Sequence, residues 1–218
     1  MRSVYRTRYR DLQGDIETTI ENDGATLRMS LCGVDFEGND FDSFEVVSST
    51  APADLSRFSF AGGTLCSCLF EFEIPVIVAV DAGELRGTLE ARLRLGSAHA
   101  TGGIDEESLH LVLVVGDLRL ESEGRSGWFE DELLDLQRRL PSHWFLKTCF
   151  GCGLSDYSPV GHGLFGGLAC FRDNKLGYRS VRTKDELFRI WDTMTAFVQE
   201  THLCPEFERR TPGAGYRG

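Results

Sequence analysis

The sequence contains no long apolar run and does not open with the pattern of a secretion signal. Its longest apolar run, residues 74–80, includes a proline, whereas a helix that crosses a bilayer needs about 20 apolar residues. No basic segment followed by an apolar one stands at the start. We therefore expect no membrane association and a cytoplasmic location.

The sequence also lacks the composition of a disulfide-stabilised secreted domain. It has seven cysteines, an odd number, in 218 residues. Without a secretion signal, such cysteines are typical of reduced thiols and metal ligands rather than of a disulfide framework. Three of them, Cys32, Cys66 and Cys68, fall in segments expected to be strands, where we expect simple buried packing.

Basic residues are the minority: 23 Lys and Arg stand against 34 Asp and Glu, for a net charge of −11. Residues 1–140 hold 26 acids and 13 bases, whereas residues 141–218 hold 8 acids and 10 bases. Binding to nucleic-acid phosphates needs a basic face, so we expect no nucleic-acid partner. An acidic N-terminal part suits a basic protein partner, although acidic residues also simply keep a protein in solution.

What is present is a core-forming composition, with 41% hydrophobic and 11% aromatic residues. Apolar and polar residues alternate with a period of two over most of the first 125 residues, as Leu89, Ala91 and Leu93 do against Glu90 and Arg92. The pattern predicts a domain over residues 1–125, an acidic antiparallel β-sandwich or open barrel. Pro75 predicts a bend or an edge. The expected strands cover residues 4–8, 15–20, 26–36, 65–80, 88–95, 109–115 and 118–121.

The pattern then becomes helical. Apolar residues at helical spacing predict a helix over 129–140, ended by Pro141. Thr183 and Glu186 fit a capping box, and the apolar spacing that follows predicts a second helix running to about residue 202. We therefore expect a mainly β protein with α (α+β), whose second part, residues 126–218, combines two helices with a cysteine knuckle and packs on the sandwich.

That knuckle is the sequence Cys149-Phe150-Gly151-Cys152-Gly153. Two thiolates three residues apart on a tight turn can bind one ion, and a glycine after the second permits the turn. By position, Cys170 and Cys204 are the natural third and fourth ligands. The four would make a closed thiolate site, which in proteins is usually structural zinc.

Other interpretations of this segment stay open. His162 and His202 are substitute ligands. The four cysteines could instead be buried free thiols. Cys149 or Cys152 with His162 as base and Asp156 as the group that orients it would form a nucleophilic arrangement, although all would crowd one glycine-rich loop. A redox CxxC is disfavoured because no helix in a βαβ setting follows.

The chain also resembles a known family through a set of motifs. They are Leu136-Gln137, Leu140-Pro141, Cys149-x-x-Cys152, Ser155-Asp156-Tyr157-Ser158-Pro159, Gly161, Phe165-Gly166, Cys170-Phe171-Arg172 and Lys175. Together, mainly over residues 133–191, they are similar to DUF6304, a bacterial family of unknown function. The resemblance implies a bacterial cytosolic origin and no particular activity. It also favours joint use of Cys149, Cys152 and Cys170.

These observations favour a non-enzymatic protein-binding role, such as an immunity or antitoxin-like protein whose acidic sandwich masks a basic partner. The alternative is an enzyme or small-ligand binder that uses the glycine-rich loop between Cys149 and Cys170. A third hypothesis is a scaffold that docks through residues 216–218.

Overall fold

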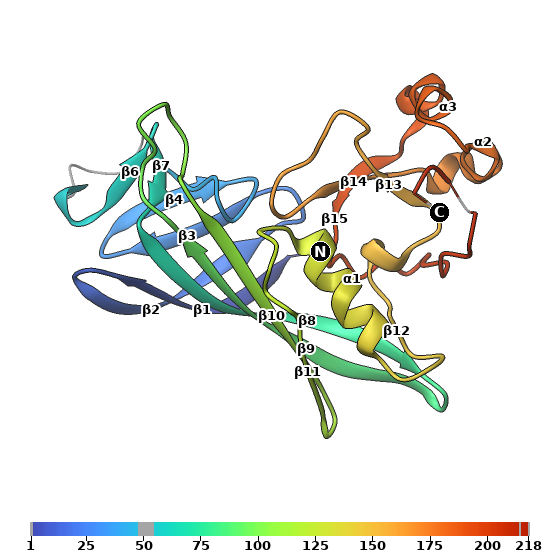
Figure 1. Cartoon of the computed structure of the whole chain (residues 1–218), viewed down its shortest axis with the longest axis horizontal. Coiled ribbons are helices and arrows are strands. Elements are labelled where there is room, and N and C mark those ends of the chain that lie inside the picture. Colours follow the sequence, from blue (N-terminus) through green and yellow to red (C-terminus); the bar gives the residue numbers. More distant parts are fainter. Residues whose placement is uncertain (1, 48–54, 214, 218) are drawn as a thin grey trace.

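The computed structural model describes residues 2–47, 55–213 and 215–217, so Gly218 of the hypothesised docking tail lies outside the described residues. Strands dominate, and helices are few and short (Figure 1). The elements are β1 Ser3–Asp11, β2 Gly14–Asn22, β3 Leu27–Leu31, β4 Val34–Gly38, β5 Glu45–Val46, η1 Leu55–Arg57, β6 Ser59–Ala61, β7 Thr64–Cys66, β8 Cys68–Val80, β9 Gly83–Leu95, β10 Glu107–Val115, β11 Leu118–Glu121, α1 Phe129–Arg139, β12 Phe145–Leu146, η2 Cys149–Gly151, β13 Ser155–Tyr157, β14 Gly167–Cys170, η3 Arg172–Asn174, α2 Lys175–Ser180, α3 Lys184–Arg189, η4 Trp191–Thr193 and β15 Ala196–Gln199.

The strands described up to Glu121 form one continuous antiparallel sheet. Its order is β11-β10-β9-β8-β1-β2-β3-β4-β5-β7-β6, and β12 adds to β8. The predicted mainly β architecture is therefore confirmed, but the sheet is a single path and not the two separate sheets of a sandwich. Aromatic rings join distant strands across its apolar face: Phe44 lies 5.8 Å from Phe70 between ring centroids. The sheet thus bends around one core.

The segments in which apolar and polar residues alternate form the expected hairpins. In β9, Leu89, Ala91, Leu93 and Leu95 are buried, while Arg92 and Arg94 are exposed. Pro75 lies in β8 between the residues that pair with β1, at 69–72, and those that pair with β12, at 78–79. Among the described residues, none pairs with that side of β8 at Pro75, so the proline occupies a local edge, as predicted.

One predicted strand is divided. Residues 26–36 form β3 and β4, joined by a turn at Cys32 and Gly33, whose φ angles are 51° and 80°. Two residues with positive φ make the tight turn that suits a two-residue hairpin. Cys32 is therefore exposed, and the expectation that it packs in the core was wrong, whereas Cys66 and Cys68 are buried as predicted.

The first predicted helix is α1, one residue shorter than expected and followed by Pro141. Phe129, Leu133 and Leu136 are fully buried and belong to the same core as the inner face of the sheet. Acidic residues begin the helix, and Arg138 and Arg139 end it, which complements the helix dipole. The predicted domain boundary near residue 125 stays a prediction.

The second predicted helix is largely wrong. Thr183 and Glu186 do form the capping box, but α3 ends at Arg189. The chain then makes a 3₁₀ turn and continues as β15, which pairs with β14 in a separate antiparallel sheet of order β13-β14-β15. The apolar residues at helical spacing were therefore divided between a short helix and a strand, because pairing with β14 overrode local preference. An additional helix, α2, was not expected.

The small sheet has its own core and also contacts the large one. Leu154, Phe171, Tyr178 and Leu187 are buried together beside β14. The side-chain nitrogen of Asn22 on β2 donates to Gln199 Oε1 on β15 at 2.6 Å, and both side chains are buried. Figure 1 shows the small sheet with α2 and α3 at one end of the molecule. Among the described residues, no helix is long and apolar enough to cross a membrane.

Candidate functional site

The cysteine knuckle is built on a 3₁₀ turn. Cys149 begins η2, and the Cys152 N–H donates to the Cys149 carbonyl at 3.1 Å. In a 3₁₀ turn, side chains three residues apart lie on the same side, which brings the two thiols together. The Ser155 hydroxyl donates to the Cys149 carbonyl at 2.7 Å and to that of Cys152 at 3.2 Å. Ser155, the first residue of β13, thus fixes the turn through both cysteine carbonyls.

The other two cysteines approach this turn from different elements. Cys170 ends β14, and Cys204 lies in the segment after β15, near His202, whose carbonyl accepts from the Cys149 N–H at 3.0 Å. All four cysteines are buried. Burial, followed by the neighbouring thiols of Cys152, Cys204 and Cys170, raises the pKa of the Cys149 thiol. The other three thiols are therefore near enough to Cys149 to act on it electrostatically.

Arg172 belongs to this cluster, although the sequence analysis did not single it out as part of the site. Burial raises the pKa of Cys170, while the Arg172 N–H and guanidinium act in the opposite direction. The Arg172 side chain also hydrogen-bonds to Cys204. An N–H two residues beyond a cysteine is the kind of donor that stabilises a thiolate, so the spacing Cys170-Phe171-Arg172 is a signal that could have identified it.

The thiols do not form a finished coordination shell as they stand. Within residues 2–47, 55–213 and 215–217, no group of three or more His, Cys, Asp or Glu side chains has the arrangement of a metal site. The donor set still fits a soft metal ion, because it consists of sulfur alone. To hold such an ion, the neighbouring thiols would have to close around it.

The substitute ligands and acid–base candidates have other roles. His162 Nδ1 is 2.9 Å from the Gly163 carbonyl, and its Nε2 is 3.2 Å from Glu130 Oε2. Asp156 is buried, and its Oδ2 accepts from the Tyr178 hydroxyl at 3.0 Å and from backbone N–H groups at the C-terminus. Asp156 therefore fixes the C-terminal segment, while His162 pairs with Glu130. Burial lowers the pKa of His202, which favours its neutral form.

Two buried carboxyl groups lie beside the glycine-rich loop, and no motif in the sequence indicates either of them. Glu200 is fully buried, accepts from the Tyr157 hydroxyl and the Gly166 N–H, and has its pKa raised well above the ordinary value by burial. Asp40 accepts from the Phe165 N–H. Two glycines of the loop leave no room for a side chain: a Cβ on Gly163 would lie 2.1 Å from Asp40 Oδ2, and one on Gly166 would lie 2.7 Å from the Tyr157 ring.

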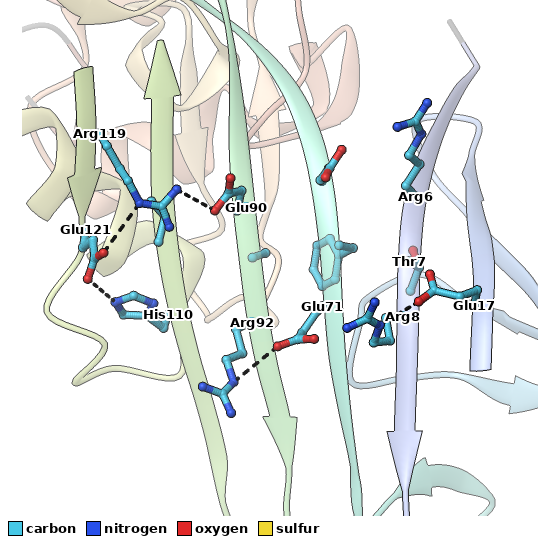
Figure 2. Close-up of a pocket in the computed structure, with 14 residues that line it drawn as sticks. Arg6, Thr7, Arg8, Glu17, Glu71, Glu90, Arg92, His110, Arg119 and Glu121 are labelled. Carbon is cyan, nitrogen blue, oxygen red and sulfur yellow. Dashed lines mark hydrogen bonds and ion pairs between the residues drawn. The ribbon is translucent and has the colours of Figure 1, made fainter. Parts of the chain in front are cut away.

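The solvent face of the large sheet carries rows of opposite charges around a hollow of about 490 Å³. Figure 2 shows arginines and glutamates pointing toward one another, from neighbouring strands or across one strand. Arg8 Nε lies 2.7 Å from Glu17 Oε1, and Arg119 Nη1 lies 3.0 Å from Glu90 Oε2. Since acids and bases nearly balance here, the acidic excess of the N-terminal part must lie elsewhere.

One group of acidic residues lies at the start of β10. Asp105, Glu106 and Glu107 are consecutive and exposed. Burial and then Asp42 raise the pKa of Glu107, while burial, followed by Asp42, raises the pKa of Asp40 to about 7. We call Asp42, Asp105, Glu106 and Glu107 the acidic patch.

Comparison with known proteins identifies a family but no characterised relative. No curated protein and no solved structure matches the chain. The model of a family of unknown function, DUF6304, matches residues 3–155. The match covers the large sheet and overlaps the motif-rich region only up to Ser155, so Cys170 and Cys204 lie beyond it. Because this match spans most of the 218 residues, the chain belongs to the DUF6304 family.

Proposed function

We propose that this chain is a non-enzymatic, bacterial, cytoplasmic protein-binding protein whose C-terminal part is stabilised by a structural zinc ion on Cys149, Cys152, Cys170 and Cys204. One observation supports the zinc site: four buried thiols, separated by up to 55 positions in the sequence, lie near enough to one another that Cys152, Cys170 and Cys204 raise the pKa of Cys149 in its 3₁₀ turn. Together they supply the all-sulfur donor set of a closed structural site.

The surroundings of the thiols support a structural role for the metal. The small sheet buries few large side chains, and its segments are joined by loops. An ion held by the knuckle, the end of β14 and the segment after β15 would cross-link three parts of the chain. Its closed shell of four ligands would leave no position for a substrate, so the metal would have a structural role and no catalytic one.

Metal content and thiol protection test the site directly. The purified protein should contain about one zinc per chain by native mass spectrometry. After unfolding, four of the seven thiols should react only once a chelator is added. Cys170→Ser should lose the zinc, whereas Cys32→Ser, which changes an exposed turn, should keep it. A metal-free wild-type protein with seven equally reactive thiols would exclude the site.

The acidic patch supports a basic protein partner, in an immunity or antitoxin-like role. Burial, and then repulsion from Asp42, raises the pKa of Glu107. A partner with lysines or arginines at this place would relieve the repulsion and be attracted over a distance. The charge-paired face in Figure 2 offers no such field.

The salt dependence of binding tests this role. A polylysine peptide should bind the protein at low ionic strength and much more weakly at physiological ionic strength. Neutralising Asp105, Glu106 and Glu107 together should abolish that binding. The matched control neutralises Glu71 and Glu90, which already face arginines. Equal loss in both variants, or binding indifferent to salt, would contradict the acidic patch as the contact surface.

A further inference from the structure

A second hollow lies between α1 and the C-terminal segment, away from the charged face of the sheet. Its volume is about 380 Å³, within the range of small-molecule sites. Leu134, Phe145, Leu146 and Phe150 supply apolar walls from three different elements. A pocket with apolar walls and a few charged groups at its rim is the usual form of a site for a small organic molecule.

The charges at this pocket are opposite to those of the whole protein. Three arginines, Arg209, Arg210 and Arg217, line it, against the single acid Glu130. The chain as a whole has a net charge of −11. This local concentration of guanidinium groups makes the pocket electropositive, and an anion is the ligand that such a site favours.

Arg217 is held in place but incompletely satisfied. Its Nη2 donates to the Phe150 carbonyl at 2.8 Å, and its guanidinium carbon lies 4.7 Å from the Tyr157 ring centroid. Its buried Nε–H has no hydrogen-bond partner among the described residues. A guanidinium that lacks an acceptor is stabilised by a carboxylate, which can accept two of its hydrogens.

The other arginines have distinct roles. Arg210 is committed to the fold, since its Nη2 donates to the Cys152 carbonyl at 3.0 Å and to the Tyr178 hydroxyl at 3.2 Å. Arg209 is exposed and stacks on Phe145, 4.3 Å from the ring centroid. Its charge is therefore available at the mouth of the pocket, above an aromatic wall.

Glu130 offsets only part of this positive field. Its Oε2 lies 3.2 Å from His162 Nε2. Burial raises its pKa, while Arg217 and His162 lower it. Among the described residues that line the pocket, one carboxyl group stands against three guanidinium groups, so the pocket keeps its attraction for an anion.

We propose that this pocket binds a small carboxylate with an apolar, aromatic body. The carboxylate pairs with Arg217 and Arg209, and the ring lies against Leu134, Phe145 and Phe150. This inference uses none of the four cysteines and none of the acidic patch, although the wall residue Phe150 belongs to the knuckle turn.

Titration calorimetry with benzoate and phenylacetate, each compared with its neutral amide, tests the proposal. We expect dissociation constants on the order of 1 mM for carboxylates of this size. The amides should bind about tenfold more weakly, because they lose the charge-assisted contact. Equal affinity of acid and amide, or no binding of either acid, would overturn the proposal.

Three variants locate the binding. Arg217→Gln should weaken carboxylate binding about tenfold, whereas Arg138→Gln, which changes an exposed arginine of α1 outside the pocket, should not. Leu134→Trp fills the pocket without removing a charge and should also abolish binding. Thermal unfolding of each variant confirms that it is folded before its affinity is compared. Wild-type affinity in folded Arg217→Gln and Leu134→Trp would place the ligand elsewhere and overturn the proposal.

Discussion

The backbone N–H of Phe165 donates to both carboxylate oxygens of Asp40, at 2.9 and 3.0 Å. The two residues are 125 positions apart, and their contact fastens the glycine-rich loop to the turn that follows β4. Asp40 is buried, and its Oδ1 also accepts from the Phe41 N–H at 2.7 Å. The loop is therefore anchored to the large sheet by a carboxyl group that has little access to water.

Asp40 makes stability depend on pH. Burial and then Asp42 raise its pKa from 3.8 to about 7, so the folded chain binds this proton more tightly than the unfolded chain does. The protonated Asp40 side chain should therefore contribute fully to the free energy of unfolding below about pH 4. This contribution should be lost as the pH rises to about 7. Between pH 4 and pH 7, the free energy of unfolding of Asp40→Asn should fall by about 2–4 kcal/mol less than that of the wild type.

Urea unfolding of wild type and Asp40→Asn at several pH values between 4 and 8 measures the effect. The two stability curves should converge at the acidic end and separate toward neutrality, with the variant above the wild type. Asp15→Asn is the control, since Asp15 is exposed and paired with Arg10. Parallel curves for wild type and Asp40→Asn would show that Asp40 ionises normally.

The glycines of the loop differ in how much room they have. A Cβ on Gly163 would lie 2.1 Å from Asp40 Oδ2, an atom fixed by Phe165, whereas a Cβ on Gly167 would lie 3.7 Å from the nearest Phe197 atom. Gly163→Ala should therefore cost about 1–3 kcal/mol, and Gly167→Ala should be neutral or slightly stabilising. Chemical denaturation measures both, and equal effects would argue against this close approach.

The two faces of the large sheet should respond very differently to substitution. Arg119 is about half exposed and pairs with Glu90 and Glu121, so Arg119→Gln should change the free energy of unfolding by less than about 1 kcal/mol. Leu93 is fully buried in the neighbouring part of the sheet, so Leu93→Ala should cost about 2–5 kcal/mol. A large loss in Arg119→Gln, measured by urea unfolding, would mean that the charge ladder stabilises the sheet substantially.

The alternation of apolar and polar residues predicted the large sheet well because one face of each strand meets the core and the other meets water. The β9 residues Leu93 and Arg94 behaved as this argument requires. The same argument failed at Cys32, which lies in a turn, because Cys32-Gly33 is not a typical turn sequence. The helix predicted over 183–202 failed because its apolar spacing also suits a strand once β14 is available as a partner.

The sequence predicted candidate site residues only where their spacing forms a motif or their residue type suggests a ligand. Cys149 and Cys152 form a recognisable motif, whereas Cys170 and Cys204 were inferred as ligands from their position alone. Glu200 gave no signal, because a glutamate followed by threonine and histidine resembles a surface segment; its burial depends on Tyr157 and Gly166, which the fold brings from 43 and 34 positions away. Buried polar contacts of this kind are decided by tertiary structure.

Removal of the proposed zinc should loosen one part of the molecule only. Hydrogen exchange of the zinc-loaded protein should show protected amides in β13, β14 and the segment that pairs with the knuckle, where the Gly153 N–H donates to Glu208 at 2.7 Å. A chelator should speed exchange there, because the cross-link between three segments is lost. The long β8–β9 hairpin should be unaffected, since its pairing involves none of the four cysteines.

Cys170→Ser should reproduce the change without chelator, and Cys32→Ser should not. Equal acceleration across both sheets would mean that the ion stabilises the whole fold, and no change at all would mean that the thiols hold the C-terminal part together without a metal.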